Sequence, residues 1–238
     1  TEDNELAAAL KSFVRDCWDT GMDLGHSIRT SPDVVRFASD DIQFATSLID
    51  MRLLTGDQQM YDTLIDKLDR RVFQDRSEHF VARCVASRRE EWTACGDSVN
   101  QLETDLKKTP GGLRDLHLLS CIAYARYKDA DPTAMLQHEV LRTHELAALQ
   151  IADEFLTGLR LDLHCRTGRK QDGLTRHLHI EMVNESDFNV EEMRAAASTL
   201  MRDYFQRTSP VAEISRRISE SPQSTGLLTR LRTALLPG

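Results

Sequence analysis

Apolar residues recur every three or four positions along most of the chain, and this spacing is typical of helices with one face on a core. A Ser-Pro-Asp start at residue 31 adds a capping hydroxyl and a first-turn proline. The predicted helices cover residues 6–18, 31–56, 57–73, 77–103, 113–128 and 133–165, and a further one follows Asn189. The pattern therefore predicts a mainly α protein built around a helical bundle.

One stretch alternates in the manner of a strand. Within Met22–Ile28, every second residue would share one face, so that Leu24 and His26 lie together and Asp23 and Ser27 face the other way. We expect this short strand near the N-terminus to be a small remnant of a β-sheet, covered on its second face by another part of the protein.

A Pro-Gly-Gly turn at residues 110–112 interrupts the helical pattern. Proline fixes φ and glycine permits positive φ, so the backbone turns sharply before the helix that begins near residue 113. Lys107, Lys108 and Arg114 place three cations around this turn, and free N–H groups at a helix start favour an anion. The turn is thus either a phosphate site or a packing device that lets two helices approach closely.

Composition excludes several classes of protein. The 238 residues carry 30 basic and 38 acidic side chains, and the formal net charge of -8 argues against nonspecific nucleic-acid binding. No apolar run reaches the length of a membrane span, and the start of the sequence has no signal-peptide pattern. The five cysteines are scattered, so we expect reduced thiols and a cytoplasmic location.

Three blocks of sequence resemble the bacterial PII uridylyltransferase/uridylyl-removing enzyme family. They are Trp18–Thr30, the segment 102–117 that ends in Pro-Gly-Gly-Leu-Arg-Asp-Leu-His, and Met201–Phe205. Their order is that of the family, although Thr104 stands where the family usually has proline. The resemblance implies transfer of UMP from UTP to the PII signal protein in nitrogen regulation.

This family belongs to the nucleotidyltransferase superfamily, which implies Mg²⁺ held by two carboxylates of a D-x-D strand and by a third acidic residue. Only the third position has a candidate here, Asp23, as catalytic and metal-binding residue; as an isolated acid it could also simply be solvated. The D-x-D pair would precede Thr1. We therefore expect a fragment that is inactive by itself, without the family's HD and ACT domains.

The resemblance also implies a set of nucleotide-binding residues. An alternative for His26 is a hydrogen-bonded core histidine, and Arg114 could instead be paired inside the helical region. If the turn serves a nucleotide, Arg114 should point toward Asp23 and Arg29. The candidate nucleotide-binding residues are His26, Ser27, Arg29, Lys107, Gly111, Gly112, Arg114 and Asp115.

The expected organisation has three parts. Residues 1–56 would form the C-terminal part of a nucleotidyltransferase domain, residues 57–220 a helical uridylyltransferase-associated domain, and residues 221–238 a loose tail. The chain would contribute nucleotide- and acceptor-binding helices to the intact enzyme but not the full metal site. The alternative function is a noncatalytic helical interaction or regulatory module related to the same family.

Overall fold

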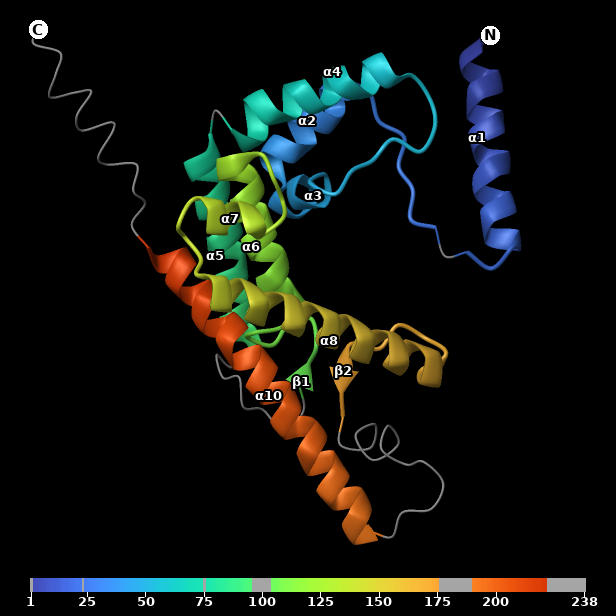
Figure 1. The fold of residues 1–238 in the computed structure, drawn as a ribbon. Helices are drawn as coiled ribbons and strands as arrows, with labels where there is room; N and C mark the ends of the chain where they lie inside the picture. Colours follow the sequence, from blue (N-terminus) through green and yellow to red (C-terminus); the bar gives the residue numbers. More distant parts are fainter. Residues whose placement is uncertain (1, 23, 75, 96–103, 176–189, 222–238) are drawn as a thin grey trace, which may run out of the picture.

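The structure, a computed structural model, describes residues 2–22, 24–74, 76–95, 104–175 and 190–221 (Figure 1). In chain order the elements are α1 (Glu2–Asp19), α2 (Ser31–Asp40), α3 (Ile42–Ser47), α4 (Gln58–Leu68), the π-helical turn η1 (Asp69–Phe73), α5 (Ser77–Cys95), β1 (Thr104–Asp105), α6 (Leu113–Tyr127), α7 (Thr133–Gln137), α8 (Thr143–Thr167), β2 (Gly173–Leu174) and α10 (Val190–Glu220). The predicted mainly α fold is confirmed.

Two helices predicted as continuous are interrupted. The helix that starts at residue 31 ends at Asp40, because Asp41 adopts extended backbone and its carboxylate accepts the N–H groups of Gln43 and Phe44, which starts α3. Between α7 and α8, Glu139 has a φ of 58°, which a helix cannot contain. A side-chain cap from Asp41 thus causes the first break, and the positive φ of Glu139 marks the second; the apolar spacing predicted neither.

The predicted strand at Met22–Ile28 is wrong for the described residues of that stretch, which have irregular backbone. A strand needs a neighbour to supply its hydrogen bonds, and no ladder forms there in the described part of the chain. The small antiparallel sheet lies elsewhere, where Thr104 pairs with Leu174 and Asp105 with Gly173. It ties the segment before α6 to the segment after α8.

Two apolar clusters hold together the described helices from α2 onward. The larger one lies around α5 and α6 and includes fully buried Leu119 and Ile122, with residues from α2 to α4 and the end of α10 packed on it. The smaller one joins β1 and β2 to α8 and α10, and its largest member is Tyr204. Figure 1 shows α10, in orange and red, running across α8 toward α5 and α6. The segments around the Pro-Gly-Gly turn are therefore fixed from both sides.

The long helix α10 contains a proline. Pro210 has no N–H, so one carbonyl of the preceding turn loses its helical donor. Just before it, Thr208 is fully buried, and its hydroxyl donates to the Tyr204 carbonyl. This stretch of α10 faces the Pro-Gly-Gly turn, and the Thr208 backbone lies against Gly111.

The first helix stands apart from the others in Figure 1. Phe13 and Trp18 on α1 are 61 % and 54 % exposed, although Val14 and Cys17 are covered. The Trp18 ring packs edge-on against His26, with 5.8 Å between the ring centroids. The N-terminal region is thus built mainly from local contacts.

Candidate functional site

The turn before α6 is closed by its own backbone. The N–H groups of Leu113 and Arg114 donate to the carbonyls of Leu106 and Lys107 at 3.0 and 2.9 Å. The Asp105 carboxylate accepts the N–H groups of Lys107 and Lys108 at 2.9 and 2.8 Å. The loop is therefore held in one shape by hydrogen bonds within its own residues, with the Thr109 hydroxyl also accepting the Asp105 N–H.

Both glycines of the turn occupy positions that a larger residue could not. Gly111 has a φ of +85°, and a Cβ added there would collide with the Thr208 carbonyl of α10. A Cβ on Gly112 would lie 2.6 Å from the Leu106 carbonyl oxygen. Gly111 allows α10 to approach the turn closely, which is what the packing alternative for this motif requires, and Gly112 allows the turn to close on its own backbone.

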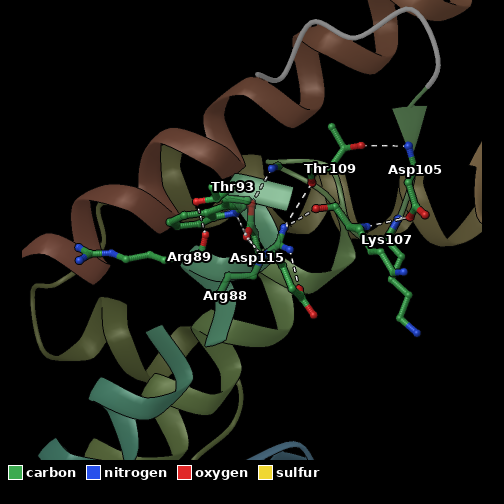
Figure 2. Close-up of polar contacts among 11 residues, drawn as sticks. Arg88, Arg89, Thr93, Asp105, Lys107, Thr109 and Asp115 are labelled. Carbon is green, nitrogen blue, oxygen red and sulfur yellow. Dashed lines mark hydrogen bonds and ion pairs between the residues drawn. The ribbon is translucent and has the colours of Figure 1, made fainter. Parts of the chain in front are cut away.

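The carboxylate of Asp115 lies at the centre of a buried polar cluster (Figure 2). It accepts hydrogen bonds from Arg88 Nε at 2.6 Å, Trp92 Nε1 at 3.0 Å and the Gly111 N–H at 2.5 Å. Asp115 is 0 % and Arg88 only 4 % exposed. The remaining donors of Arg88 reach Glu91 at 2.8 Å and the Lys108 carbonyl at 2.9 Å. We call Arg88, Trp92, Gly111 and Asp115 the corner cluster.

The corner cluster has its own anion. Burial raises the pKa of the Asp115 carboxyl, and the adjacent Arg88 guanidinium opposes that rise by charge and hydrogen bonding. The Gly111 N–H, which the sequence offered to a phosphate, is already used by this carboxylate. The contacts of Gly111, Gly112 and Asp115 are thus those of a structural brace; that they also bind nucleotide stays a prediction.

Arg114, next to this brace, has different surroundings. Its Nε is buried without a hydrogen-bond partner, and no ion pair joins it to another residue that the structure describes. It borders a cleft between α3, α5 and α6 with a volume of about 40 Å³ for water-sized groups. The polar side chains lining the cleft are Gln43, Thr46, Ser87, Arg88, Glu91, Arg114 and His117. Arg114 is therefore a cationic donor with spare bonding capacity.

His117 lines this cleft, and the Asp50 carboxylate acts on His117 electrostatically; neither was among the predicted site residues. His117 lies one helical turn after Arg114, so the two share a face of α6. Burial lowers the pKa of His117; the Asp50 carboxylate opposes that shift, while Arg114 and Lys107 add to it. The spacing of Arg114 and His117 was a signal for the second residue. The approach of Asp50 to His117 depends on the loop after α3, whose path the sequence pattern does not determine.

The N-terminal candidates lie in a more open setting. His26, Ser27 and Arg29 are exposed, and the Arg29 guanidinium lies 4.1 Å from the centre of the Phe37 ring. Its Nε donates to the Ser27 hydroxyl at 3.3 Å. No hydrogen bond or ion pair links these three to the turn among the residues described. Asp23 lies outside the described residues, so its distance from Arg114 stays a prediction.

A magnesium site is not formed by the described residues. No group of three or more histidine, cysteine, aspartate or glutamate side chains in residues 2–22, 24–74, 76–95, 104–175 and 190–221 could hold a metal ion. The Mg²⁺ expected of the intact enzyme therefore has no donor set in this part of the molecule.

Comparison with known proteins settles the family. The model of the GlnD PII-uridylyltransferase family matches residues 79–219, which include α5, the Pro-Gly-Gly turn, α6, α8 and most of α10. This chain belongs to that family. Within its matched segment lie the corner cluster, Arg114 and His117; the N-terminal candidates precede it.

Individual relatives extend the similarity over almost the whole chain. A bifunctional uridylyltransferase/uridylyl-removing enzyme of Nitrosococcus oceani is 27 % identical over 99 % of this chain, and one of Nitrobacter winogradskyi is 31 % identical over 83 %. These matches cover 26 % and 21 % of the two relatives. The chain thus spans about a quarter of the length of the curated relatives it matches. No solved structure matches it significantly.

Among the described residues, none of the helices is both long enough and apolar enough to cross a membrane. The longest, α10, carries charged residues along its length.

Proposed function

We propose that this chain is the helical part of a uridylyltransferase that moves UMP from UTP to the PII signal protein. The family membership supports the chemistry, and one structural observation supports the role of this region. Arg114, which belongs to the motif shared with the family, borders a cleft with a buried guanidinium nitrogen that has no protein partner. A nucleotide phosphate supplies the acceptor that such a donor needs.

The residues of the Pro-Gly-Gly motif would have two different roles, ligand binding and positioning. Lys107 and Arg114 are the cations that meet the nucleotide, since both act electrostatically on the same cleft residue, His117. Gly111, Gly112 and Asp115 are positioning residues, which fix the start of α6 and so the place of Arg114. The buried ion pair of Arg88 and Asp115 is suited to that role because its geometry is set from α5 and α6 together.

The remaining parts of the proposal concern partners. A nucleoside triphosphate and a PII-like acceptor would meet this region in the bacterial cytoplasm, with Mg²⁺ held by other parts of the enzyme. His26, Ser27 and Arg29 would contact the nucleotide from the N-terminal side. Their exposure leaves their polar groups open to a ligand.

A chimera tests the proposal. This chain would replace the matching quarter of the Nitrosococcus oceani enzyme, and transfer of radiolabelled UMP from UTP to PII would be measured with Mg²⁺ present. We expect transfer to be retained in the chimera. Replacing Arg114 with Ala should lower kcat/KM by about tenfold or more, the value of a lost charge-assisted hydrogen bond. The matched control is Arg89→Ala, because Arg89 is exposed on α5 and points away from Asp115 in Figure 2.

The outcome also decides between the two functions predicted from the sequence. A chimera that folds, as judged by circular dichroism, but leaves PII unlabelled would point to the noncatalytic interaction module. Equal activities for the Arg114→Ala and Arg89→Ala chimeras would show that Arg114 takes no part in nucleotide use.

A further inference from the structure

The cleft beside Arg114 has the dimensions of a small anion. Its volume of about 40 Å³ is about three times the space one water needs, and this suits a single phosphoryl group rather than a base or a sugar. Side chains with hydrogen-bond donors line it from three elements, with Gln43 on α3, Ser87 on α5, and Arg114 and His117 on α6. The Thr46 hydroxyl also borders the cleft but donates to the Gln43 carbonyl at 3.0 Å. A tetrahedral anion, with acceptor oxygens in several directions, can use donors arranged in this way.

The charge balance of the cleft leaves Arg114 available. Although Glu91 also borders the cleft, its carboxylate is paired with Arg88 at 2.8 Å. Arg88 is in turn committed to Asp115 at 2.6 Å. The uncommitted cation is therefore Arg114, whose buried Nε forms no bond in the described part of the chain.

His117 is a titratable group that lines the cleft, and because burial holds its pKa below 6.5, it gains a proton in weakly acidic solution. Its Nε2 lies 3.8 Å from the Cys121 sulfur, which ties the ring to α6. A proton on this ring would add a second positive charge next to Arg114. The titratable and charged groups around His117 are Asp50 after α3, Cys84, Arg88 and Glu91 on α5, Lys107 in the loop, and Arg114 and Cys121 on α6.

We infer that this cleft binds one terminal phosphoryl group, that Arg114 is its main anchor, and that His117 strengthens binding as it gains a proton. The inference rests on the proposed function and makes it more specific. The group bound is the phosphate end of the nucleotide or of the pyrophosphate that nucleotidyl transfer releases. UMP, whose only phosphate is the one transferred, lacks this end.

Calorimetric titration of the 238-residue chain tests the inference with pyrophosphate, UTP, UMP and inorganic phosphate as probes. Pyrophosphate and UTP should bind at least tenfold more tightly than UMP. Arg114→Ala should weaken pyrophosphate binding about tenfold or more, while Arg114→Lys, which keeps the charge without the planar fork, should retain part of it. Arg89→Ala serves as the control and should bind as the parent chain does.

The pH dependence isolates His117. The affinity ratio of the parent chain to His117→Gln should rise between pH 8 and pH 5.5, and taking this ratio cancels the titration of pyrophosphate itself. A ratio that stays constant with pH overturns the role of His117. Equal pyrophosphate binding by the parent chain and Arg114→Ala, with unchanged circular dichroism, overturns the site.

The two proposals fail separately. A chimera that transfers UMP to PII, while the chain shows no pyrophosphate binding, removes the phosphoryl site and keeps the proposed function. Pyrophosphate binding that depends on Arg114, together with a folded chimera that cannot transfer UMP, overturns the proposed function and with it the assignment of the ligand to that reaction.

Discussion

The Pro-Gly-Gly turn and the N-terminal segment 21–30 were both predicted from the sequence to hold nucleotide-binding residues, yet their surroundings in the structure are opposite. In the turn, Gly111 and Asp115 are buried, and their polar groups bond to each other and to α5. In the segment, Met22 and Ile28 are 57 % and 71 % exposed, and the Arg29 side chain bonds to its near neighbour Ser27. Of two segments predicted to bind nucleotide, one is therefore a structural brace and the other an open surface.

The comparison also shows which hydrogen-bond donors remain available to bind an anion. At the turn the obvious anion site is filled by the protein's own carboxylate, and the spare donor lies one residue away at Arg114. A cationic side chain is available to bind an anionic ligand only where no nearby carboxylate is already paired with it. The difference between the two regions can be sharpened by four substitution or pH experiments.

The largest effect should come from Asp115→Ala. This change leaves the Arg88 guanidinium buried without its carboxylate, and the loss of one member of such a pair costs about 3–5 kcal/mol of unfolding free energy. Urea unfolding followed by circular dichroism measures it. The control is Asp66→Ala, whose ion pair with Arg70 is exposed and should be worth under about 1 kcal/mol. A loss below about 1 kcal/mol for Asp115→Ala would contradict the role of the brace.

Gly111→Ala should rank next, and Gly21→Ala is its matched comparison. Both glycines have nearly the same φ, +85° and +82°, but a Cβ on Gly111 meets the α10 backbone while one on Gly21 meets nothing within 4 Å. The shared backbone strain costs about 1–2 kcal/mol, and the collision adds about 1–3 kcal/mol at residue 111 only. Equal melting temperatures for the two variants would show that α10 can yield without cost.

A smaller effect should come from the titration of His117. Burial holds its folded-state pKa below the ordinary value of 6.5, so the unfolded chain binds a proton first as the pH falls. Stability should therefore be full above about pH 7 and decline as the pH drops below about 6.5, until the folded-state pKa is reached. Comparing unfolding free energies of the parent and His117→Gln between pH 7.5 and 5.5 measures this contribution. A parent minus variant difference that does not change with pH would refute it.

The smallest effect should come from Arg29→Ala in the open segment. Its guanidinium stacks on Phe37 at an exposed site, an interaction worth about 0.5–1 kcal/mol. Stability should therefore change by no more than about 1 kcal/mol, while UMP transfer by the chimera should fall. Arg36→Ala is the control, since Arg36 stacks on the same ring at 5.1 Å. A variant of Arg29 with unchanged transfer would remove it from the proposed nucleotide contacts.

Much of the fold could be predicted from the sequence because apolar spacing sets helices directly. The predicted helices at 113–128 and 57–73 correspond closely to α6 and to α4 with η1. The failures have local physical causes. Asp41 caps a new helix within a continuous apolar stripe, and Met22–Ile28 alternates like a strand without acquiring one to pair with.

The candidate site was harder to predict because its ion pairs join residues that are far apart in the sequence. Asp115 could be placed near the start of a helix, but the sequence around it did not indicate that Arg88 and Trp92 of the preceding helix would contact its carboxylate. Once that pair forms, Arg114 is left with its Nε unbonded. The same holds for Asp50, which reaches the electrostatic range of His117 only through the path of a loop.

The contact between Gly111 and Thr208 has a consequence for how the protein is made. The two residues are almost a hundred positions apart, so α5, the turn and α6 leave the ribosome before the stretch of α10 that covers them exists. At ordinary rates of synthesis this interval is about 5–20 s. During it, the Arg88–Asp115 pair has water on the side that α10 later closes, and the turn is completed only after Thr208 has been synthesised.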